Sequence, residues 1–436
     1  MKLFYQVVGK LEGYETIDYR FESEILRDFR LSSDAMHAYY RDEALITYIF
    51  PMSLASRSPD LFTESGRLEN LEEHFVNRFA PQVKHNDFRT LIIQSIGDFD
   101  GIDFRGDYDD VVLRIFGRMV EDYLNLRPDE IYVDISTGLN LYVSALLEAF
   151  RYFLIWVRLL EFGSSDIPHF YRLFAEPFLG DRSKEIYDIY RKRMRAKAFF
   201  LSPINAVNLE RFSPIADVRL LRRFLVVFSS IYRNAPLYLF HHGIDDSEII
   251  RNAIYDLLRR ISDETGAYRS GEGYVEFDGK GRRRLYTDLL LSYALYHRIS
   301  SVVYDLVDGE IFEDYKDMGV HVDYLMKTFE KIYNLFGLEM NMYLLENEVN
   351  KLKDRILHDR RTRAKFEFRF SPVKFALEYY SDRDDGKING RNFLAHAGFE
   401  SSITIARVWK NALYLKYDED VEDEIEHVLL EIDPTF

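Results

Sequence analysis

Residues 130–150 read EIYVDISTGLNLYVSALLEAF, and this stretch changes its pattern halfway. The run EIYVDIS is apolar and β-branched, as expected of a buried strand, and LYVSALLEAF has the apolar spacing of a helix. Ser136, Thr137 and Gly138 lie between the two patterns, where a strand turns into a helix. The stretch therefore predicts one strand–turn–helix unit of an α/β fold.

The rest of the first 205 residues repeats this alternation. Further strand-like runs occur at residues 3–8, 44–50, 90–97 and 198–203. Residues 109–124 show one apolar helical stripe, made by Val112, Ile115, Phe116, Met119 and Tyr123. Near-continuous apolar strands alternating with helices predict a mostly parallel, doubly wound, Rossmann-like sheet covered on both faces. We assign it to residues 1–205.

After prolines 203 and 214 the pattern becomes mainly helical, as in VDYLMKTFEKIYNLFGLEMNMYLLENEVNKLKDRI. Residues 206–436 are therefore predicted to form a mainly α-helical second domain. A glycine-punctuated segment at 264–284 is either a hairpin or a disordered loop.

Composition excludes several classes of protein. The chain of 436 residues has no cysteine, which excludes disulfides, thiolate nucleophiles and cysteine-bound zinc. No run reaches the roughly 18 apolar residues that a membrane span needs, and the start turns polar too soon for a secretory signal, so we expect a cytoplasmic protein without membrane contact. A formal net charge of −16 argues against a protein that coats long nucleic acid.

Two strand ends carry polar and glycine residues that suit a ligand. Open α/β sheets bind ligands beyond the carboxyl ends of their strands, and a helix N-terminus there favours phosphate. The candidate residues are Ser95, Gly97, Ser136, Thr137, Gly138 and Asn140. The alternative is that they only satisfy the turns. Neither GxGxxG nor GxxxxGK[ST] occurs, so dinucleotide and P-loop signatures are absent.

The second candidate is RNFLAHAGFE, residues 391–400, which follows the turn signal Asn389-Gly390. Cleavage of RNA without a metal needs a proton carrier and a cation for the growing phosphate charge. His396 and Arg391 suit these roles, and Asn392 could orient the phosphate or the imidazole. Five residues along a regular helix separate the two by about 140°, so a symmetric pair of helices at a two-fold axis would assemble the site better than one helix. The alternative is an ordinary helix with a surface arginine and a histidine at the edge of the core.

These motifs together resemble the CRISPR-associated CARF–HEPN ribonucleases of type III systems. RNFLAHAGFE resembles the HEPN signature Arg-x4-His, VDISTGLN resembles the CARF motif Asp-x-Ser/Thr-His-Gly-x-Asn, and SIGDFDGIDFRG resembles another CARF segment. The resemblance implies that the first domain is a CARF sensor of cyclic oligoadenylate, with cyclic tetra-adenylate as the usual activator, and that the second is a HEPN ribonuclease. It also implies a homodimer, or an oligomer of dimers, that cuts single-stranded RNA in antiviral defence without a metal or cofactor.

The resemblance carries residue roles with it. Arg391, Asn392 and His396 take the catalytic positions, and the six strand-end residues surround the cyclic nucleotide. Thr137 departs from the pattern, because it stands where the family has histidine, which leaves open the ring size, its affinity and any cleavage of the ring. A basic cluster, Arg360, Arg361, Arg363 and Lys365, could line an RNA groove. A nucleotide-sensing transcriptional regulator, a catalytically inactive scaffold and a small-molecule α/β enzyme remain as alternatives.

Overall fold

The computed structural model describes residues 1–62, 65–85, 87–176, 185–279, 281–307, 309–376, 388–418 and 420–431. The chain packs into two compact units, Met1–Ala198 with Ile254–Leu291, and Phe199–Ala253 with Ser292–Phe436. Packing therefore does not divide the chain at one point in the sequence. The predicted functional boundary at residue 205 stays a prediction.

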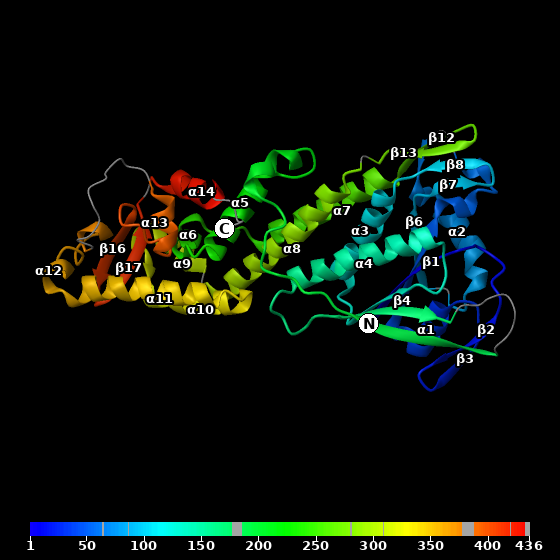
Figure 1. Cartoon of the computed structure of the whole chain (residues 1–436), viewed down its shortest axis with the longest axis horizontal. Coiled ribbons are helices and arrows are strands. Elements are labelled where there is room, and N and C mark those ends of the chain that lie inside the picture. Colours follow the sequence, from blue (N-terminus) through cyan, green and yellow to red (C-terminus); the bar gives the residue numbers. More distant parts are fainter. Residues whose placement is uncertain are drawn as a thin grey trace. The chain divides into compact units, whose positions relative to one another are not determined.

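The first unit is built on a large mixed sheet, which has eight strands in the part of the chain that the structure describes (Figure 1). Its spatial order is β3-β2-β11-β10-β9-β1-β4-β6. In chain order these strands are β1 (Lys2–Val7), β2 (Ile17–Phe21), β3 (Glu24–Phe29), β4 (Ala44–Pro51), β6 (Phe88–Ile93), β9 (Glu130–Asp134), β10 (His169–Ala175) and β11 (Ile186–Met194).

The order of the parallel strands makes this a doubly wound sheet. The chain runs from β1 outward through β4 to β6 and then returns to the other side of β1 with β9 and β10, all pairing in parallel. The direction of winding thus reverses between β1 and β9, which is where such sheets bind ligands. The predicted α/β class is confirmed, but β2, β3, β10 and β11 were not predicted from the sequence.

Both faces of the sheet are covered by helices. On one face Phe4 and Tyr132 belong to a core that includes Met36 of α1 (Ser32–Tyr40) and Phe75 of α2 (Glu72–Phe79). On the other, the hydroxyl of Tyr5 donates to Asp122 Oδ2 of α3 (Tyr108–Leu126) at 2.9 Å. Figure 1 shows α3 beside α4 (Asn140–Leu160), and α3 carries the predicted apolar stripe, all of it buried. Two covered faces explain why the central strands β1 and β4 are buried along almost their whole length.

A second sheet, with five strands among the described residues, includes the hairpin of residues 267–277 and thereby joins this segment to the first unit. Its order is β5-β12-β13-β8-β7, formed by β5 (Ser65–Arg67), β7 (Ile96–Phe99), β8 (Ile102–Arg105), β12 (Ala267–Gly271) and β13 (Tyr274–Phe277). The glycine-punctuated segment is therefore a hairpin, the first of the two predicted alternatives. It lies between α7 (Ser247–Gly266) and α8 (Arg283–Leu306), each of which has residues in both units.

The second unit is mainly helical, as predicted. Its helices are α5 (Val218–Tyr232), α6 (Pro236–His242), α9 (Gly309–Met318), α10 (Val322–Phe336), α11 (Glu339–Lys353), α12 (Arg360–Arg363), α13 (Gly390–Ala395) and α14 (Glu422–Glu431). Gly337, with φ +72°, ends α10 in the left-handed region and divides the long helical pattern in two. None of the described helices has the length and apolar character needed to cross a bilayer.

Two features of this unit were not predicted. One is a small sheet in the order β14-β17-β16-β15, formed by β14 (Val320–His321), β15 (Ser371–Pro372), β16 (Thr404–Trp409) and β17 (Ala412–Tyr417). The other is that residues 198–203 form no strand, so that expectation was wrong. Phe200 is instead buried by aromatic packing, with its ring centroid 4.3 Å from that of Phe336. Packing of single side chains thus replaces strand pairing there.

Candidate functional site

The turn between β9 and α4 lies directly against the end of β1. Gly138 has φ +109°, and a Cβ at this position would lie 3.0 Å from the Cβ of Val7. A Cβ on Gly9 would in turn lie 3.2 Å from the amide nitrogen of Gly138. Both the backbone angle and the close approach therefore require glycine at 138. The end of β1 and the turn after β9 are thus in direct contact where the direction of winding reverses.

The hydroxyl groups at this turn are held by the protein. Thr137 Oγ1 donates to the carbonyl of Val7 at 3.2 Å and accepts from Gln6 Nε2 at 3.0 Å. Ser136 Oγ accepts from the amide of Ala175 at 2.8 Å. These bonds fix the shape of the turn. Asn140 is exposed at the first position of α4, beside the free amides of that helix end.

The other predicted strand end lies at the same edge of the sheet. The amide of Ile96 donates to the hydroxyl of Tyr142 at 3.0 Å, which places the turn after β6 next to the first turn of α4. Gly97 is exposed there, with φ +106°. Ser95 is fully buried, and its hydroxyl donates to Ser53 Oγ at 3.0 Å. Ser95 thus lies beneath this edge and connects the ends of β6 and β4.

Several polar groups beneath this edge were not among the predicted binding residues, although Asp134 belongs to the motif VDISTGLN. Asp134 is buried at the end of β9 and accepts from Ser32 Oγ at 2.6 Å and from the amide of Ser136 at 2.8 Å. Burial raises the pKa of the Asp134 carboxyl, and the hydrogen bonds partly oppose that shift. Ser33 donates to Gln6 Oε1. Gly9, directly after the first apolar run, is a further local feature at this edge.

In the second unit, α13 presents the predicted catalytic segment. The side chain of Asn389 caps the helix by accepting from the amide of Asn392 at 3.1 Å. Phe393 is buried and anchors the helix, whereas Arg391 is exposed and Asn392 is half-buried. The helix is shorter than expected, because it ends at Ala395 and residue 397 already has φ +53°.

His396 caps the C-terminal end of α13 and contacts a second helix. Its Nδ1 lies 3.1 Å from Oε2 of Glu348 on α11. The His396 side chain is 30% exposed and that of Glu348 is 16% exposed, so the pair lies at the surface without being freely solvated. Glu348 is 48 positions away in sequence, and no local motif identifies it.

In the basic cluster of residues 360–365, only some of the charged side chains have polar partners among the residues that the structure describes. Arg360 and Arg361 are exposed on α12, which Asp359 caps. Arg363 Nε lies 2.9 Å from Glu367 Oε1. The exposed members therefore keep their charge available to a polyanion.

One group of described residues could hold a metal ion, namely His242, Glu422 and Glu426. Arg222 Nε already lies 2.9 Å from Glu426 Oε2 and supplies a positive charge there. None of the predicted catalytic residues belongs to this group.

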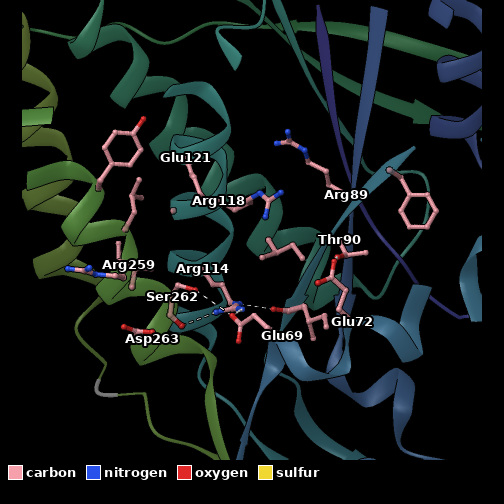
Figure 2. A pocket seen from close by; sticks show the side chains of 17 residues that line it. Glu69, Glu72, Arg89, Thr90, Arg114, Arg118, Glu121, Arg259, Ser262 and Asp263 are labelled. Carbon is pink, nitrogen blue, oxygen red and sulfur yellow. Dashed lines mark hydrogen bonds and ion pairs between the residues drawn. The ribbon is translucent and has the colours of Figure 1, made fainter. Parts of the chain in front are cut away.

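A cavity of about 590 Å³ opens at the outer edge of β6, within the first unit. Figure 2 shows Arg114 directed toward Glu69 and Ser262 in this cavity. Arg114 Nε donates to the carbonyl of Ile92 at 2.7 Å, so the guanidinium satisfies part of the open edge of the strand. Among the described lining residues there is none of those predicted for either site.

The chain matches two protein families. Residues 3–177 match the family described as CRISPR system endoribonuclease Csx1, CARF domain. Residues 338–419 match CRISPR system endoribonuclease Csx1, HEPN domain. A search of curated proteins gave no match. The first match supports a sensor of cyclic oligoadenylate and the second supports an endoribonuclease that acts on RNA. The chain therefore belongs to the CRISPR-associated CARF–HEPN ribonuclease family.

Proposed function

We propose that this protein is an endoribonuclease of type III CRISPR defence that cyclic oligoadenylate activates and that needs no metal. The observation that carries the proposal is α13, a short capped helix with an exposed arginine at its start and a partly exposed histidine at its end. These are the two groups that RNA cleavage by the ribose 2′-OH requires.

The chemistry assigns one role to each group. A neutral imidazole of His396 takes the proton of the 2′-OH as the 2′-oxygen bonds to phosphorus. The bond from phosphorus to the 5′-oxygen then breaks, and a second imidazolium gives that oxygen a proton. Arg391 stabilises the charge that grows on the phosphate oxygens, and Asn392 orients the phosphate. The products are a 2′,3′-cyclic phosphate and a 5′-hydroxyl.

We place two copies of α13 at the axis of a homodimer, because two histidines then supply both the base and the acid. The substrate is a few nucleotides of single-stranded RNA. Such a short contact suits a chain with a net charge of −16, with the exposed basic cluster on α12 as the RNA-contacting surface.

The activator is cyclic oligoadenylate, and a two-fold pocket favours cyclic tetra-adenylate. Its site is the edge formed by Gly97, Ser136, Thr137, Gly138 and Asn140, with Ser95 supporting that edge from below. Free amides at the start of α4 suit a phosphate of the ring. The Thr137 hydroxyl is committed to Gln6 and Val7, so we expect the turn to contact the ring mainly through its backbone.

The test is an RNA cleavage assay in EDTA, with and without cyclic tetra-adenylate. We expect cutting only with the activator, and loss of at least about 100-fold in His396→Ala. The matched control is His427→Ala, which removes an exposed histidine of α14 and should leave the rate unchanged. Equal RNA integrity in every sample would overturn the proposal. The transcriptional regulator and the catalytically inactive scaffold would then be the alternatives for the function. Cleavage that persists in His396→Ala would place the active site elsewhere.

A further inference from the structure

The contact between His396 and Glu348 is built into the second unit. Glu348 lies on the same helix as Leu345, Val349 and Leu352, which are buried and hold α11 against the core. The carboxylate is also held on its other side, because Lys351 Nζ lies 2.6 Å from Oε1. The second oxygen, Oε2, lies 3.1 Å from Nδ1 of His396.

This geometry determines where the imidazole carries its proton. An ionised carboxylate can accept hydrogen bonds but cannot donate them, so the contact requires a hydrogen on Nδ1. When the ring is neutral, its lone pair is then on Nε2. A carboxylate beside Nδ1 also stabilises the positive ring that forms when Nε2 takes up a proton.

We infer that Glu348 is a positioning residue of the ribonuclease site, which holds His396 in its Nδ1–H form so that Nε2 exchanges protons with the RNA. The inference rests on the proposed function and adds a residue to it. Glu348 itself moves no proton and touches no substrate. Among the described residues, Lys351 is the charged group bound to this carboxylate.

The first test separates turnover from binding in the full-length protein with activator. Glu348→Ala should lower kcat by about 10- to 100-fold and change KM by less than about threefold, because the imidazole stays but loses its orientation. Glu348→Gln should lie between wild type and Glu348→Ala, since its amide oxygen accepts the same hydrogen bond but carries no charge to stabilise the positive ring. Glu346→Ala, an exposed glutamate on the same helix, is the matched control and should match wild type.

The second test reads the tautomer without RNA, from ¹⁵N shifts of selectively labelled histidines assigned with His396→Ala. Wild type and Glu348→Gln should show the Nδ1–H form at His396, and Glu348→Ala should lose it. A loss of kcat with an unchanged tautomer signal would overturn the inference, as would wild-type kcat in a Glu348→Ala protein that keeps its circular dichroism spectrum. A wild-type protein that leaves RNA intact while His396 shows the Nδ1–H form would instead overturn the proposed function, and with it the catalytic part of this role.

Discussion

At the scale of single residues, the proposed activator edge depends on positions where no side chain is tolerated. Gly138 is such a position, because any Cβ there meets Val7 at 3.0 Å in a backbone conformation that other residues rarely adopt. Asn140, two positions later, is exposed at the start of α4 and can be changed without disturbing that contact.

Replacing Asn140 with aspartate should therefore affect stability and ligand binding in opposite directions. A negative charge in the first turn of α4 should stabilise the helix by about 0.3–1 kcal/mol. The same charge should repel the phosphates of the ring and weaken activator binding by about tenfold. Thermal unfolding and calorimetric titration with cyclic tetra-adenylate measure the two effects.

The control for this substitution is Asn70→Asp, which adds the same charge at another exposed position of the first unit. It should leave the affinity for the ring unchanged. An Asn140→Asp protein that binds the ring as well as wild type would show that the ring does not reach this helix end.

At the scale of elements, the start of α3 concentrates negative charge. Asp107 caps the helix, and Asp109 and Asp110 follow in its first turn. Asp110 is buried, and its Oδ2 has no hydrogen-bond partner among the residues that the structure describes. Burial, together with the neighbouring carboxylates of Asp107, Glu264 and Asp109, raises the pKa of Asp110 to about 7.

This shift predicts how stability depends on pH. The folded protein binds the Asp110 proton more tightly than the unfolded chain, in which an aspartate titrates near 4. The contribution of Asp110 to the free energy of unfolding therefore falls between about pH 4 and pH 7 and is constant above. Asp110→Asn should flatten this decline and be more stable than wild type at pH 8, by on the order of 1–3 kcal/mol.

Urea denaturation from pH 4 to pH 8 measures this dependence. Asp60→Asn, an exposed aspartate of the same unit, should keep the wild-type pH profile. Identical slopes for wild type and Asp110→Asn would mean that Asp110 is ionised in the folded protein throughout this range.

At the scale of the whole molecule, sensing and cutting are assigned to different units. The proposed activator residues belong to Met1–Ala198 and the proposed catalytic residues to Ser292–Phe436. If the catalytic groups work in pairs across a two-fold axis, the two chains supply two histidines to one site, one as the base and the other as the acid.

A dimer of one wild-type chain and one His396→Ala chain tests this arrangement. Such heterodimers, co-expressed with different tags and purified, should cut RNA at least about tenfold more slowly than wild type, because one histidine cannot supply both the base and the acid. The homodimers from the same preparation are the controls. Heterodimers that keep about half of the wild-type rate would mean that each chain needs only its own histidine.

The sequence by itself determined the class of fold and pointed to the two segments to which function is assigned. The apolar strand runs and the stripe on α3 are local periodic patterns. They can be recognised without knowing which segments pack against them. The motifs DISTGLN and RNFLAH were likewise readable, because turn and cap chemistry is local: Gly138 has its positive φ, and Asn389 caps α13.

Only the tertiary structure decided which distant groups meet. It placed Ser95 beneath the proposed activator edge, brought residues 254–291 into the first unit, and set Glu348 against His396. The physical reason is that each of these contacts joins segments many positions apart in the sequence. The pattern within one segment does not show which distant segment packs against it.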